Sequence, residues 1–598
     1  MTSSRTRRIS SVVAVAALAV AGAAFTGGTS SAGPNGPTVD IQLLSFNDFH
    51  GNLEPPAGSS GNNVVDHEMR PDPKTGELKP ADVTVPGGGV EYLATHLADA
   101  RQGHKNTLTV AAGDIVGASP LLSAAFHDEP TVLAMNKLGL DVTSVGNHEF
   151  DEGYKEIQRL QNGGCIDDGD GANNQNSCPT GSFPGAGFDI LAANVFVTAT
   201  GKTILPAYTI KNVNGAKIAF IGMTLKDTPN IVTASGVAGL TFTDEVKTAN
   251  ALVPQLKKKN VNAIVVLIHQ GGQPTSPVFD STCGNGGELN PASSPIIDIA
   301  KNLDPAIDMV ISGHTHQPYV CNIPDPAGQP RLVTSASSFG RLFTETDLKY
   351  DRRTNDIVRT SVKGTNMIVT RDVAKDAAQT ALVTQYQELV KPIASKVVGH
   401  IATDVTRTIS PAGESQLGDL IADAQLADPS VITNGETPVI AFMNPGGIRA
   451  DLTYASSSKG EGNGVVTYEE AFTVQPFNNY LVSMTLTGAQ IKQILTEQWS
   501  GVNSGSPKVL QVSDGFVYSY SGTTLGPVTL NGAPLVDGDS YRIVTNNFLQ
   551  GGGDGFPTFV DGTGVFYGGL DIDAFANYLT TFGDTGYTPG PLTRITKN

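Results

Sequence analysis

The stretch of sequence that decides the fold is Val142-Thr143-Ser144-Val145 followed by Gly146-Asn147-His148-Glu149-Phe150-Asp151. Its first four residues form a short apolar run of the kind found in buried strands, and the residues that follow it are mostly polar. Similar runs recur along the first half of the chain. The buried strands that they predict are 39–46, 107–112, 142–145, 188–193, 217–221, 263–268 and 307–311.

Helical patterns lie between several of these runs, because apolar residues recur at three-to-four spacing over 90–100 and 132–138. Together with the strands they predict an α/β fold with much of its sheet buried. Residues 372–398 contain no glycine and carry one apolar face, which predicts a long helix that joins two domains. The second unit then begins with a helix over 417–426, and Asn531-Gly532 marks a hairpin within it.

Composition narrows the class of protein. The 598 residues are 39% hydrophobic and 16% charged, as in a soluble globular protein, while Gly 67 and Pro 36 indicate many turns rather than a helical bundle. The net charge of −18 argues against binding to a long nucleic acid, since that binding depends on an excess of Lys and Arg. A small phosphate pocket remains compatible with this charge.

The first residues predict export. Arg5, Arg7 and Arg8 precede an apolar segment over 12–25, and Ser30-Ser31-Ala32 offers a cleavage site for a signal peptide. This segment is shorter than the roughly 20 residues that cross a bilayer. We therefore expect a protein that is secreted to the extracellular space, with no membrane attachment after cleavage.

Four cysteines agree with an oxidising compartment: Cys165, Cys178, Cys283 and Cys321. Three pairings are possible, and the local one, 165 with 178 and 283 with 321, has the lowest loop-closure cost. Their spacing does not match a structural zinc site. The acidic, glycine-rich residues 163–185 predict a surface insertion.

Five of the ten histidines follow the predicted strands directly, each near Asp, Asn or Gly. Loops at the carboxyl edge of one sheet converge on one crevice, so these side chains are expected to meet. Imidazole and carboxylate donors without thiolate suit Zn, Mn, Fe or Co, and their number suits two ions about 3.5–4 Å apart. The other histidines lack ligand neighbours in the sequence and are predicted to bind no metal: His67, His96, His104, His127 and His400.

The order of these motifs is recognisable. Asn47-Asp48-Phe49-His50-Gly51, Gly113-Asp114, the 146–151 motif, His269-Gln270-Gly271-Gly272 and Gly313-His314-Thr315-His316 resemble the calcineurin-like metallophosphoesterases. In the second half, the motifs at 444–449, 475–479 and 547–556 resemble the C-terminal domain of the 5′-nucleotidases. The resemblance spans roughly residues 38–592. It implies a four-layer αββα sandwich, then a smaller α/β substrate-binding domain.

Residue roles follow from the resemblance. Asp48, His50 and His316 would hold one ion, Asn147, His269 and His314 the other, and Asp114 would bridge both. His148 would face the phosphate and stabilise the transition state or protonate the leaving oxygen, oriented by Asp151. The implied division is a signal peptide over 1–32, a phosphoesterase domain over 38–371, a linking helix over 372–399 and a nucleotide-binding domain over 400–592.

In the second domain, Phe477 and Phe548 would enclose a base between two rings, and Asp554 would accept hydrogen bonds from ribose hydroxyls. Arg449 would hold phosphate, and Asn444 and Asn479 would complete the pocket. One departure stands out: Gly413 occupies the position where many relatives have an arginine. Arg407, six residues upstream, is a candidate substitute.

The sequence therefore predicts a dinuclear-metal phosphohydrolase that releases phosphate from nucleoside 5′-monophosphates, with rotation about the linking helix to bring substrate to the metals. The expected partner is a nucleotide or nucleotide-derived small molecule, and no oligomeric state is favoured. Two alternatives stay open because of Gly413: a 2′,3′-cyclic phosphodiesterase with 3′-nucleotidase action, and a nucleotide-sugar hydrolase. A catalytically silent nucleotide-binding protein is the rival of another class, disfavoured because every expected ligand position is filled.

Overall fold

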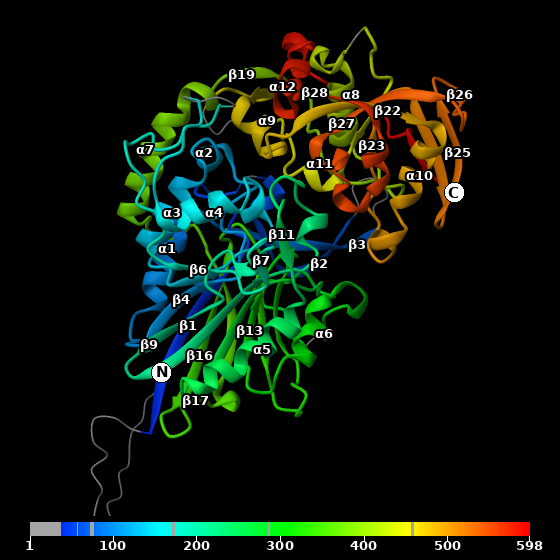
Figure 1. Cartoon of the computed structure of the whole chain (residues 1–598). Coiled ribbons are helices and arrows are strands. Elements are labelled where there is room, and N and C mark those ends of the chain that lie inside the picture. The colour runs from blue at the N-terminus through cyan, green and yellow to red at the C-terminus, as the bar shows by residue number, and fades with distance from the viewer. Residues whose placement is uncertain are drawn as a thin grey trace, which may run out of the picture.

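The computed structural model describes residues 37–598, apart from 57, 72–76, 170–173, 285–287, 434 and 456–459. The predicted signal peptide lies outside the described residues. In Figure 1 the N-terminal part, blue to green, lies below the C-terminal part, yellow to red. Helix α7 (Ala377–Ala394) runs between the two along one side. Within the described ranges, no helix has the length and apolar character that crossing a membrane requires.

The first sheet has the order β17-β16-β1-β4-β5-β6, with β18 paired to β16. Strands β1, β4, β5 and β6 are parallel, so their carboxyl ends lie at one edge. The bounds are β1 (Thr38–Phe46), β4 (Thr107–Ala111), β5 (Val142–Ser144), β6 (Asp189–Leu191), β16 (Leu342–Asp351), β17 (Asp356–Ile357) and β18 (Lys363–Ile368).

The second sheet has the order β14-β15-β13-β12-β10-β9, and β10, β12, β13 and β15 are parallel. The bounds are β9 (Tyr208–Val213), β10 (Ala216–Thr224), β12 (Ala263–His269), β13 (Met309–Ser312), β14 (Pro318–Asn322) and β15 (Leu332–Ala336). All seven predicted strands are thus present. The expectation that the histidine-bearing strands share one sheet is wrong: β1, β4 and β5 belong to the first sheet, and β12 and β13 to the second.

Apolar clusters show how the layers pack. Inward side chains such as Leu43 and Val110 of the first sheet meet Phe220 and Val265 of the second in one buried cluster. Other side chains of the first sheet, including Phe46, pack against helices on its outer face, and helices likewise cover the outer face of the second sheet. The covering helices are α1 (Val90–Ala100) and α3 (Glu129–Leu138) on one side, and α5 (Glu245–Lys258) and α6 (Pro295–Asn302) on the other. The predicted α/β class is confirmed.

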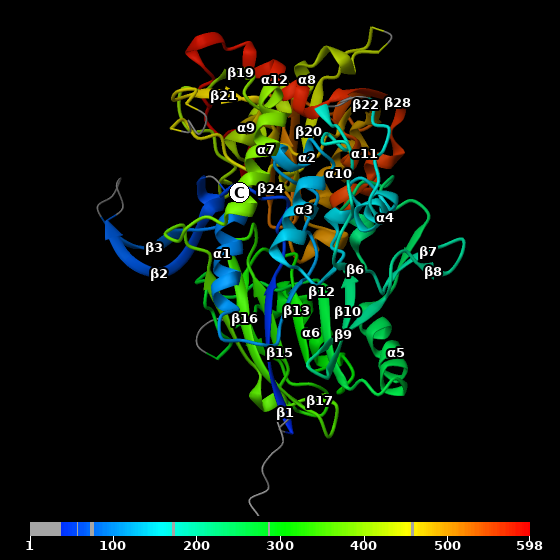
Figure 2. The same cartoon turned by 90° about the vertical axis from the view of Figure 1, so that its left-hand side faces the viewer.

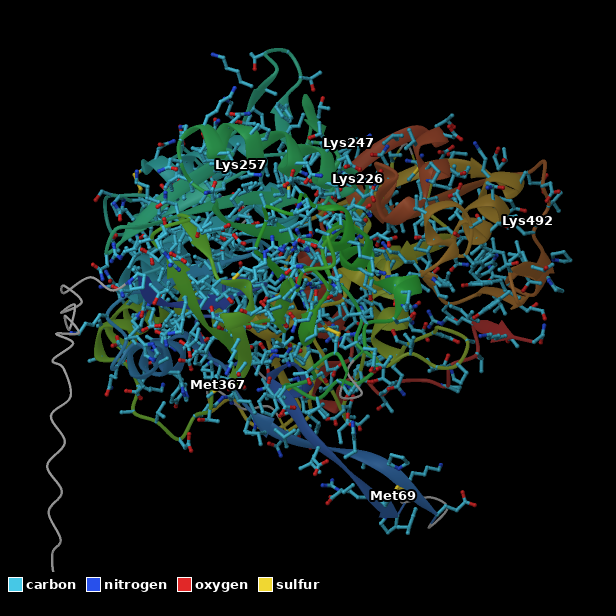
Figure 3. The ribbon with its side chains drawn as sticks, turned by 90° about the horizontal axis from the view of Figure 1, so that it is seen from below. Met69, Lys226, Lys247, Lys257, Met367 and Lys492 are labelled. Carbon is cyan, nitrogen blue, oxygen red and sulfur yellow. A yellow bond between two sulfur atoms is a disulfide. The ribbon has the colours of Figure 1, made fainter. Side chains whose placement is uncertain are left out.

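Shorter elements surround this core in the N-terminal part. Strands β2 (Asn62–Pro71) and β3 (Leu78–Pro86) form a ribbon that projects from the body in Figure 2, and Met69 lies near its end in Figure 3. The remaining elements of this part are β7 (Val195–Val197), β8 (Lys202–Thr203), β11 (Leu240–Phe242), α2 (Leu121–Ala124) and α4 (Tyr154–Asn162).

The C-terminal part holds a five-stranded sheet, β23-β20-β27-β22-β28, and a four-stranded sheet, β26-β25-β24-β29. Strand β19 pairs with β21 beside them. The strand bounds are β19 (Val397–His400), β20 (Ile440–Met443), β21 (Val465–Thr467), β22 (Tyr480–Thr487), β23 (Gln511–Val512), β24 (Phe516–Ser521), β25 (Thr524–Leu530), β26 (Ala533–Pro534), β27 (Ser540–Asn546), β28 (Thr563–Leu570) and β29 (Ile595–Lys597). The helices are α8 (Gln416–Ala427), α9 (Tyr468–Val474), α10 (Gly488–Glu497), α11 (Asn547–Gln550) and α12 (Asp571–Thr580).

Two predicted elements of this part are present, and one is shorter than expected. Helix α8 matches the predicted 417–426, and the Asn531-Gly532 hairpin joins β25 to β26. The helix predicted within 372–398 begins only at Ala377, because the Asp376 side chain accepts the Gln379 N–H and caps it there. It ends at Ala394, before the short strand β19.

Both disulfides follow the local pairing: Cys165 bonds to Cys178, and Cys283 to Cys321. The first closes the predicted surface insertion. Asn174 within that insertion donates a hydrogen bond from Nδ2 to the Tyr468 hydroxyl at 3.0 Å, so the insertion also contacts α9 of the C-terminal part. These bonds agree with folding in an oxidising compartment.

Candidate functional site

The ends of β1, β4, β12 and β13 bring carboxylates and imidazoles of the two sheets together. Asp48 Oδ1 lies 3.3 Å from His316 Nε2, and His50 Nε2 lies 3.2 Å from the same nitrogen. Asp114 Oδ2 lies 2.8 Å from His269 Nε2. The ligand atoms of Asp48, His50 and His316 form one compact group, and those of Asp48, Asp114 and His269 form another that shares Asp48.

The backbone of this cluster is strained. Five predicted ligands have positive φ angles: Asp48 at 50°, His50 at 48°, Asp114 at 49°, His314 at 75° and His316 at 57°. Such angles are uncommon for residues other than glycine and cost free energy, which the surrounding structure must supply. Hydrogen bonds between the loops do so, since the His50 N–H donates to the Asp114 carbonyl at 2.9 Å. The chain therefore holds these side chains where they are before any ligand arrives.

Hydrogen bonds also fix the imidazole tautomers. His50 Nδ1–H donates to the Gly117 carbonyl at 2.8 Å, and His269 Nδ1–H donates to the Ala112 carbonyl at 2.7 Å. Because a carbonyl only accepts, the lone pair of each ring is left on Nε2, which faces the carboxylates. Two electron-rich atoms 2.8 Å apart, as in the His269–Asp114 pair, need a proton or a metal ion between them.

Electrostatics in the cluster fit a cation. Burial lowers the pKa of His50 and of His316, and burial with the charge of His269 lowers that of His314 to about 3, so these rings stay neutral as metal ligation requires. Burial would raise the pKa of the Asp48 carboxyl, but neighbouring imidazoles outweigh it and bring it to about 2. Burial opposes protonation of His269, yet Asp114 and Asp48 raise its pKa to about 10. The carboxylates thus draw in positive charge, which a metal ion can supply in place of that proton.

Asn147 and His314, the other predicted ligands, lie against the same cluster. Asn147 Oδ1 is 3.0 Å from His314 Nδ1. Asp114 Oδ1 accepts the His148 N–H at 2.8 Å, which ties the 146–151 motif to the predicted bridging carboxylate. The donor set therefore fits the metal ions expected from the sequence: seven O and N donors, no sulfur, and buried carboxylates at the centre.

Two supporting residues shape the loops. Glu149 accepts the Asp114 N–H at 3.0 Å and the Ile115 N–H at 2.8 Å, and it also accepts the Gly146 N–H. Asn47 was not predicted as a site residue, although it opens the first motif. Its Nδ2 donates to Asp48 Oδ2 at 2.6 Å and to a backbone carbonyl at 2.7 Å, so it orients the carboxylate.

His148 lies beside the cluster, where the two parts of the chain meet. Its Nδ1–H donates to Asp151 Oδ2 at 2.9 Å, as predicted, which leaves Nε2 free to act on a ligand. Its ring stacks on Phe477 of the C-terminal part, with centroids 5.7 Å apart and planes at 27°. The Arg449 guanidinium also lies over the Phe477 ring, 5.9 Å from its centroid. A cavity of about 210 Å³ opens next to His148, Asp151 and Phe477.

Three histidines that were expected to lack ligand neighbours have carboxylates beside them. His67 Nδ1 lies 2.8 Å from Asp82 Oδ1. His127 Nδ1 lies 2.6 Å from Glu152 Oε2, and His104 Nδ1 lies 3.8 Å from Asp347 Oδ1. These carboxylates come from residues distant in the sequence, so the local pattern could not reveal them. These contacts lie outside the cluster of predicted ligands. The donors of His127 with Glu152 and Glu156, and those of His104 with Glu345 and Asp347, are close enough together to hold a cation.

The C-terminal part joins three polar residues of the predicted pocket region into a network. Asn444 Nδ2 donates to Asp554 Oδ2 at 3.0 Å, and Asn546 Nδ2 donates to Asn444 Oδ1 at 3.0 Å. The ammonium of Lys508 pairs with Asp554 Oδ1. Lys508 belongs to none of the motifs, and nothing in the sequence signals its partner 46 residues away.

Two other predicted pocket residues lie less directly in it. The backbone carbonyl of Asn479 accepts the Asp571 N–H at 2.8 Å, and its side chain bonds to the buried Asp571 carboxyl, so it supports the start of α12. Phe548 in α11 is half-buried and packs against the core of the C-terminal part and over Gly553. Both contacts are those of a packing residue.

Gly413 adopts a φ of +86°, and a Cβ placed there would lie 2.7 Å from Val509 Cγ2. The position is closed to a side chain without rearrangement. Arg407 lies near enough to Arg449 for its charge, after burial, to lower the Arg449 pKa. Its guanidinium contacts only the Ile448 carbonyl, at 3.4 Å, among the described hydrogen bonds.

Comparison with known proteins agrees with this geometry. The calcineurin-like phosphoesterase family matches residues 42–318, and the 5′-nucleotidase C-terminal domain matches residues 397–561. The chain is 32% identical over 591 residues to cell wall protein Lmo0130 of Listeria monocytogenes, covering 93% of this chain and 69% of that protein. The chain belongs to the 5′-nucleotidase family. Calcineurin-like phosphoesterases use a dinuclear metal site, and the Asp/His cluster is the candidate for it here.

Other members of this family extend beyond the present chain or share its length. It is 30% identical to Endonuclease YhcR of Bacillus subtilis, covering 91% of this chain but only 40% of that protein. It is 23% identical to the 5′-nucleotidase of Vibrio cholerae, covering 91% and 90%. A 5′-nucleotidase precursor from Thermus thermophilus has the same fold, with a TM-score of 0.70 at 24% identity over 94% of this chain and 99% of that one.

Proposed function

We propose that this chain is a secreted, dinuclear-metal phosphohydrolase that releases phosphate from nucleoside 5′-monophosphates. One observation carries the proposal: the His148 ring of the phosphoesterase half stacks on Phe477 of the nucleotidase half, beside the Asp/His cluster. A nucleotide held by the second half would therefore present its phosphate to the first. We propose the division 38–371, 372–399 and 400–592 for the two domains and their linking helix.

The metal ligands that we propose are Asp48, His50 and His316 for one ion, Asn147, His269 and His314 for the other, and Asp114 between them. Two divalent ions in such a site supply positive charge that stabilises a transferring phosphoryl group and activates water for attack. The chain's contribution is to hold the donors in place through strained, hydrogen-bonded loops. Zn, Mn, Fe and Co all suit these donors.

His148 acts at the leaving oxygen in this proposal. The Asp151 carboxylate holds Nδ1–H at 2.9 Å, so Nε2 is directed to the substrate. From there it donates a proton or hydrogen bond to the oxygen that departs with the nucleoside, where negative charge develops. Arg449, close to the same face, offers a planar fork for phosphate oxygens. The Arg407 guanidinium lies near that of Arg449 and supplies the second positive charge. Gly413 cannot supply it, because glycine has no side chain.

The nucleoside would rest on the second half. Asp554, held between Asn444 and Lys508, has lone pairs left for ribose hydroxyls. Phe477 and Phe548 would enclose the base, which gives affinity with little choice among bases. Asn479 lies two residues after Phe477 in the sequence and would complete the pocket on that side, without a contact with Asp554.

A substrate panel tests the proposal. Phosphate release from 5′-AMP, 3′-AMP, 2′,3′-cyclic AMP and UDP-glucose would be measured as kcat/KM with purified enzyme loaded with Mn or Zn. We expect 5′-AMP to be the best substrate and chelation of the metals to abolish release. Faster turnover of 2′,3′-cyclic AMP would assign the chain to the cyclic phosphodiesterases, and faster turnover of UDP-glucose to the nucleotide-sugar hydrolases. Release from none of them by metal-loaded enzyme would contradict an enzymatic role.

Export is supported by the two disulfides and by relatives whose names include a cell wall protein and venom enzymes. We propose cleavage near Ala32 and release of the mature protein. Its nucleotide partner would be a small molecule rather than a long nucleic acid, given the net charge of −18. N-terminal sequencing of protein from the culture medium would test the cleavage.

A further inference from the structure

We propose that Lys508 forms a subsite for a phosphate on the 2′ or 3′ oxygen of the ribose. The inference rests on the proposed function, because it takes Asp554 as the ribose-binding residue, and it narrows the substrate class. The ligands that it favours are nucleoside 3′,5′-bisphosphates, or the first nucleotide of a 5′-phosphorylated oligonucleotide. The two sources share one chemistry, which is a phosphate attached to the ribose hydroxyl edge.

The position of the ammonium carries the argument. Lys508 pairs with Asp554 Oδ1, while Asn444 donates to Asp554 Oδ2 at 3.0 Å, so the carboxylate lies between an amide and an ammonium. A ribose hydroxyl bound to this carboxylate would lie within two hydrogen-bond lengths of the ammonium, roughly 5–6 Å. A phosphate on the neighbouring ribose oxygen would reach still closer.

Charge and exposure suit this role. The Lys508 side chain is 31% exposed, whereas Asp554 is 9% exposed, so the ammonium extends from the buried carboxylate toward the solvent side. An ammonium has three donors, and in the described part of the chain Lys508 pairs with no second carboxylate. Donors therefore remain for phosphate oxygens. A pocket built for unmodified ribose alone would need no cation beside Asp554, because hydroxyls donate directly to a free carboxylate.

Hydrogen bonds hold the backbone on both sides of the pair. Asn503 Nδ2 donates to the Asp554 carbonyl at 2.9 Å, and the Lys508 N–H donates to the Gln498 carbonyl at 2.9 Å. Both partners thus belong to segments that are hydrogen-bonded to the residues that follow α10. A fixed cation discriminates between ligands better than a flexible surface lysine does, since less side-chain entropy is lost on binding.

The test compares two substrates in one variant. Release of the 5′-phosphate from adenosine 3′,5′-bisphosphate and from 5′-AMP would be followed by chromatography of the products, for wild type, Lys508→Gln and Lys508→Arg. We expect Lys508→Gln to lower the ratio of kcat/KM, bisphosphate over 5′-AMP, by about 10-fold or more, the usual effect of losing one charged hydrogen bond. Lys508→Arg should keep most of the ratio. Substitution of the bisphosphate by the dinucleotide pApA distinguishes the oligonucleotide source.

Lys492→Gln is the matched control. Lys492 makes a comparable ion pair, with Asp537 Oδ1 at 2.6 Å, on the outer side of the C-terminal part in Figure 3, and its loss should leave the ratio unchanged. If Lys508 only holds or neutralises Asp554, both substrates will lose the same factor in Lys508→Gln. An unchanged ratio would therefore overturn the subsite.

A binding measurement separates this inference from the proposed function. Calorimetry would compare adenosine 3′-phosphate with adenosine, neither of which has a 5′-phosphate to be cleaved. Tighter binding of the 3′-phosphate, lost in Lys508→Gln, supports the subsite even if 5′-AMP is not hydrolysed. Equal binding of both ligands to wild type would overturn the subsite even if 5′-AMP is a good substrate.

Discussion

The predicted metal ligands and the predicted substrate-binding residues differ in how many have a strained backbone conformation. Five predicted metal ligands have positive φ angles and keep polar side chains there, whereas among the predicted substrate-binding residues only Asp554 has a positive φ. At Gly413 the second half meets a left-handed angle by giving up the side chain altogether. Strain is retained where a donor must point at a fixed spot, because metal ligation tolerates little displacement. A pocket for a flat base and a ribose depends more on apolar surfaces, and its loops hold fewer such residues: Asp554 at 57°, and Asn478 beside Phe477 at 49°.

The largest effect should come from Asp114, the proposed bridging carboxylate of the phosphoesterase half. Asp114→Ala removes the carboxylate that lies 2.8 Å from His269 and also the acceptor of the His148 N–H. We expect turnover to fall by several orders of magnitude and metal content to drop below two ions per chain. Elemental analysis and phosphate release would be measured on the same sample, with circular dichroism as the check on folding. Near-normal activity with two ions retained would contradict the proposed bridge.

His148→Ala should come next, and it separates chemistry from metal binding. Loss of a group that acts only on the leaving oxygen should lower kcat by about 10²–10⁴-fold while the ions stay in place. Asp151→Asn is the companion variant, because it keeps the shape but weakens the acceptor of Nδ1–H, and it should cost less than His148→Ala. Loss of an ion in His148→Ala would show instead that this residue is a ligand.

The difference between the halves also explains what the sequence could and could not predict. Predicted ligands such as His50 and His269 lie at or just after strand ends, so a local pattern predicts both the strand and the donor. Which sheet holds each strand depends on long-range pairing, and the expectation that the histidine-bearing strands share one sheet was wrong for that reason. The start of α7 could have been predicted from the sequence, since Asp376 and Gln379 have the spacing of a capped helix.

The second half was less predictable because its contacts join distant segments. Lys508 pairs with Asp554, 46 residues further along the chain, and no sequence motif indicates this contact. Phe477 meets His148 only once the two parts of the chain are packed together. For Phe548 the motif predicts a binding role, while its contacts with the core and Gly553 are equally those of a packing residue. Experiments on this half therefore need readouts that distinguish binding from stability.

Phe548→Ala provides such a readout. A base–aromatic stack contributes roughly 1–3 kcal/mol, so KM for every nucleoside monophosphate should rise about 5- to 150-fold. Hydrolysis of p-nitrophenyl phosphate, which has no nucleobase, should barely change when it is measured well below saturation. The ratio of the two activities does not depend on how much enzyme is folded. An unchanged ratio would mean that Phe548 only packs in the core. The proposal of a nucleotide pocket would then rest on Asp554 and Arg449.

The smallest effect on turnover is expected at Gly413, and it tests the contrast in strain directly. Gly413→Ala places a Cβ at a φ of +86° and 2.7 Å from Val509 Cγ2, whereas Gly532→Ala places one at +77° with nothing within 4 Å. Both substitutions carry the left-handed cost of about 1–2 kcal/mol. Only Gly413→Ala adds the overlap with Val509, which should cost about 1–3 kcal/mol more in the free energy of unfolding.

Denaturant unfolding of the two glycine variants beside wild type would measure this difference, and kcat/KM for 5′-AMP would be taken per folded enzyme. We expect stability to separate the variants while their activity stays close to wild type, because Gly413 contributes no side chain to the proposed site. Equal losses of stability would mean that the loop moves away from Val509 at little cost. The position could then accept an arginine, and the second half would be adaptable where the first is fixed.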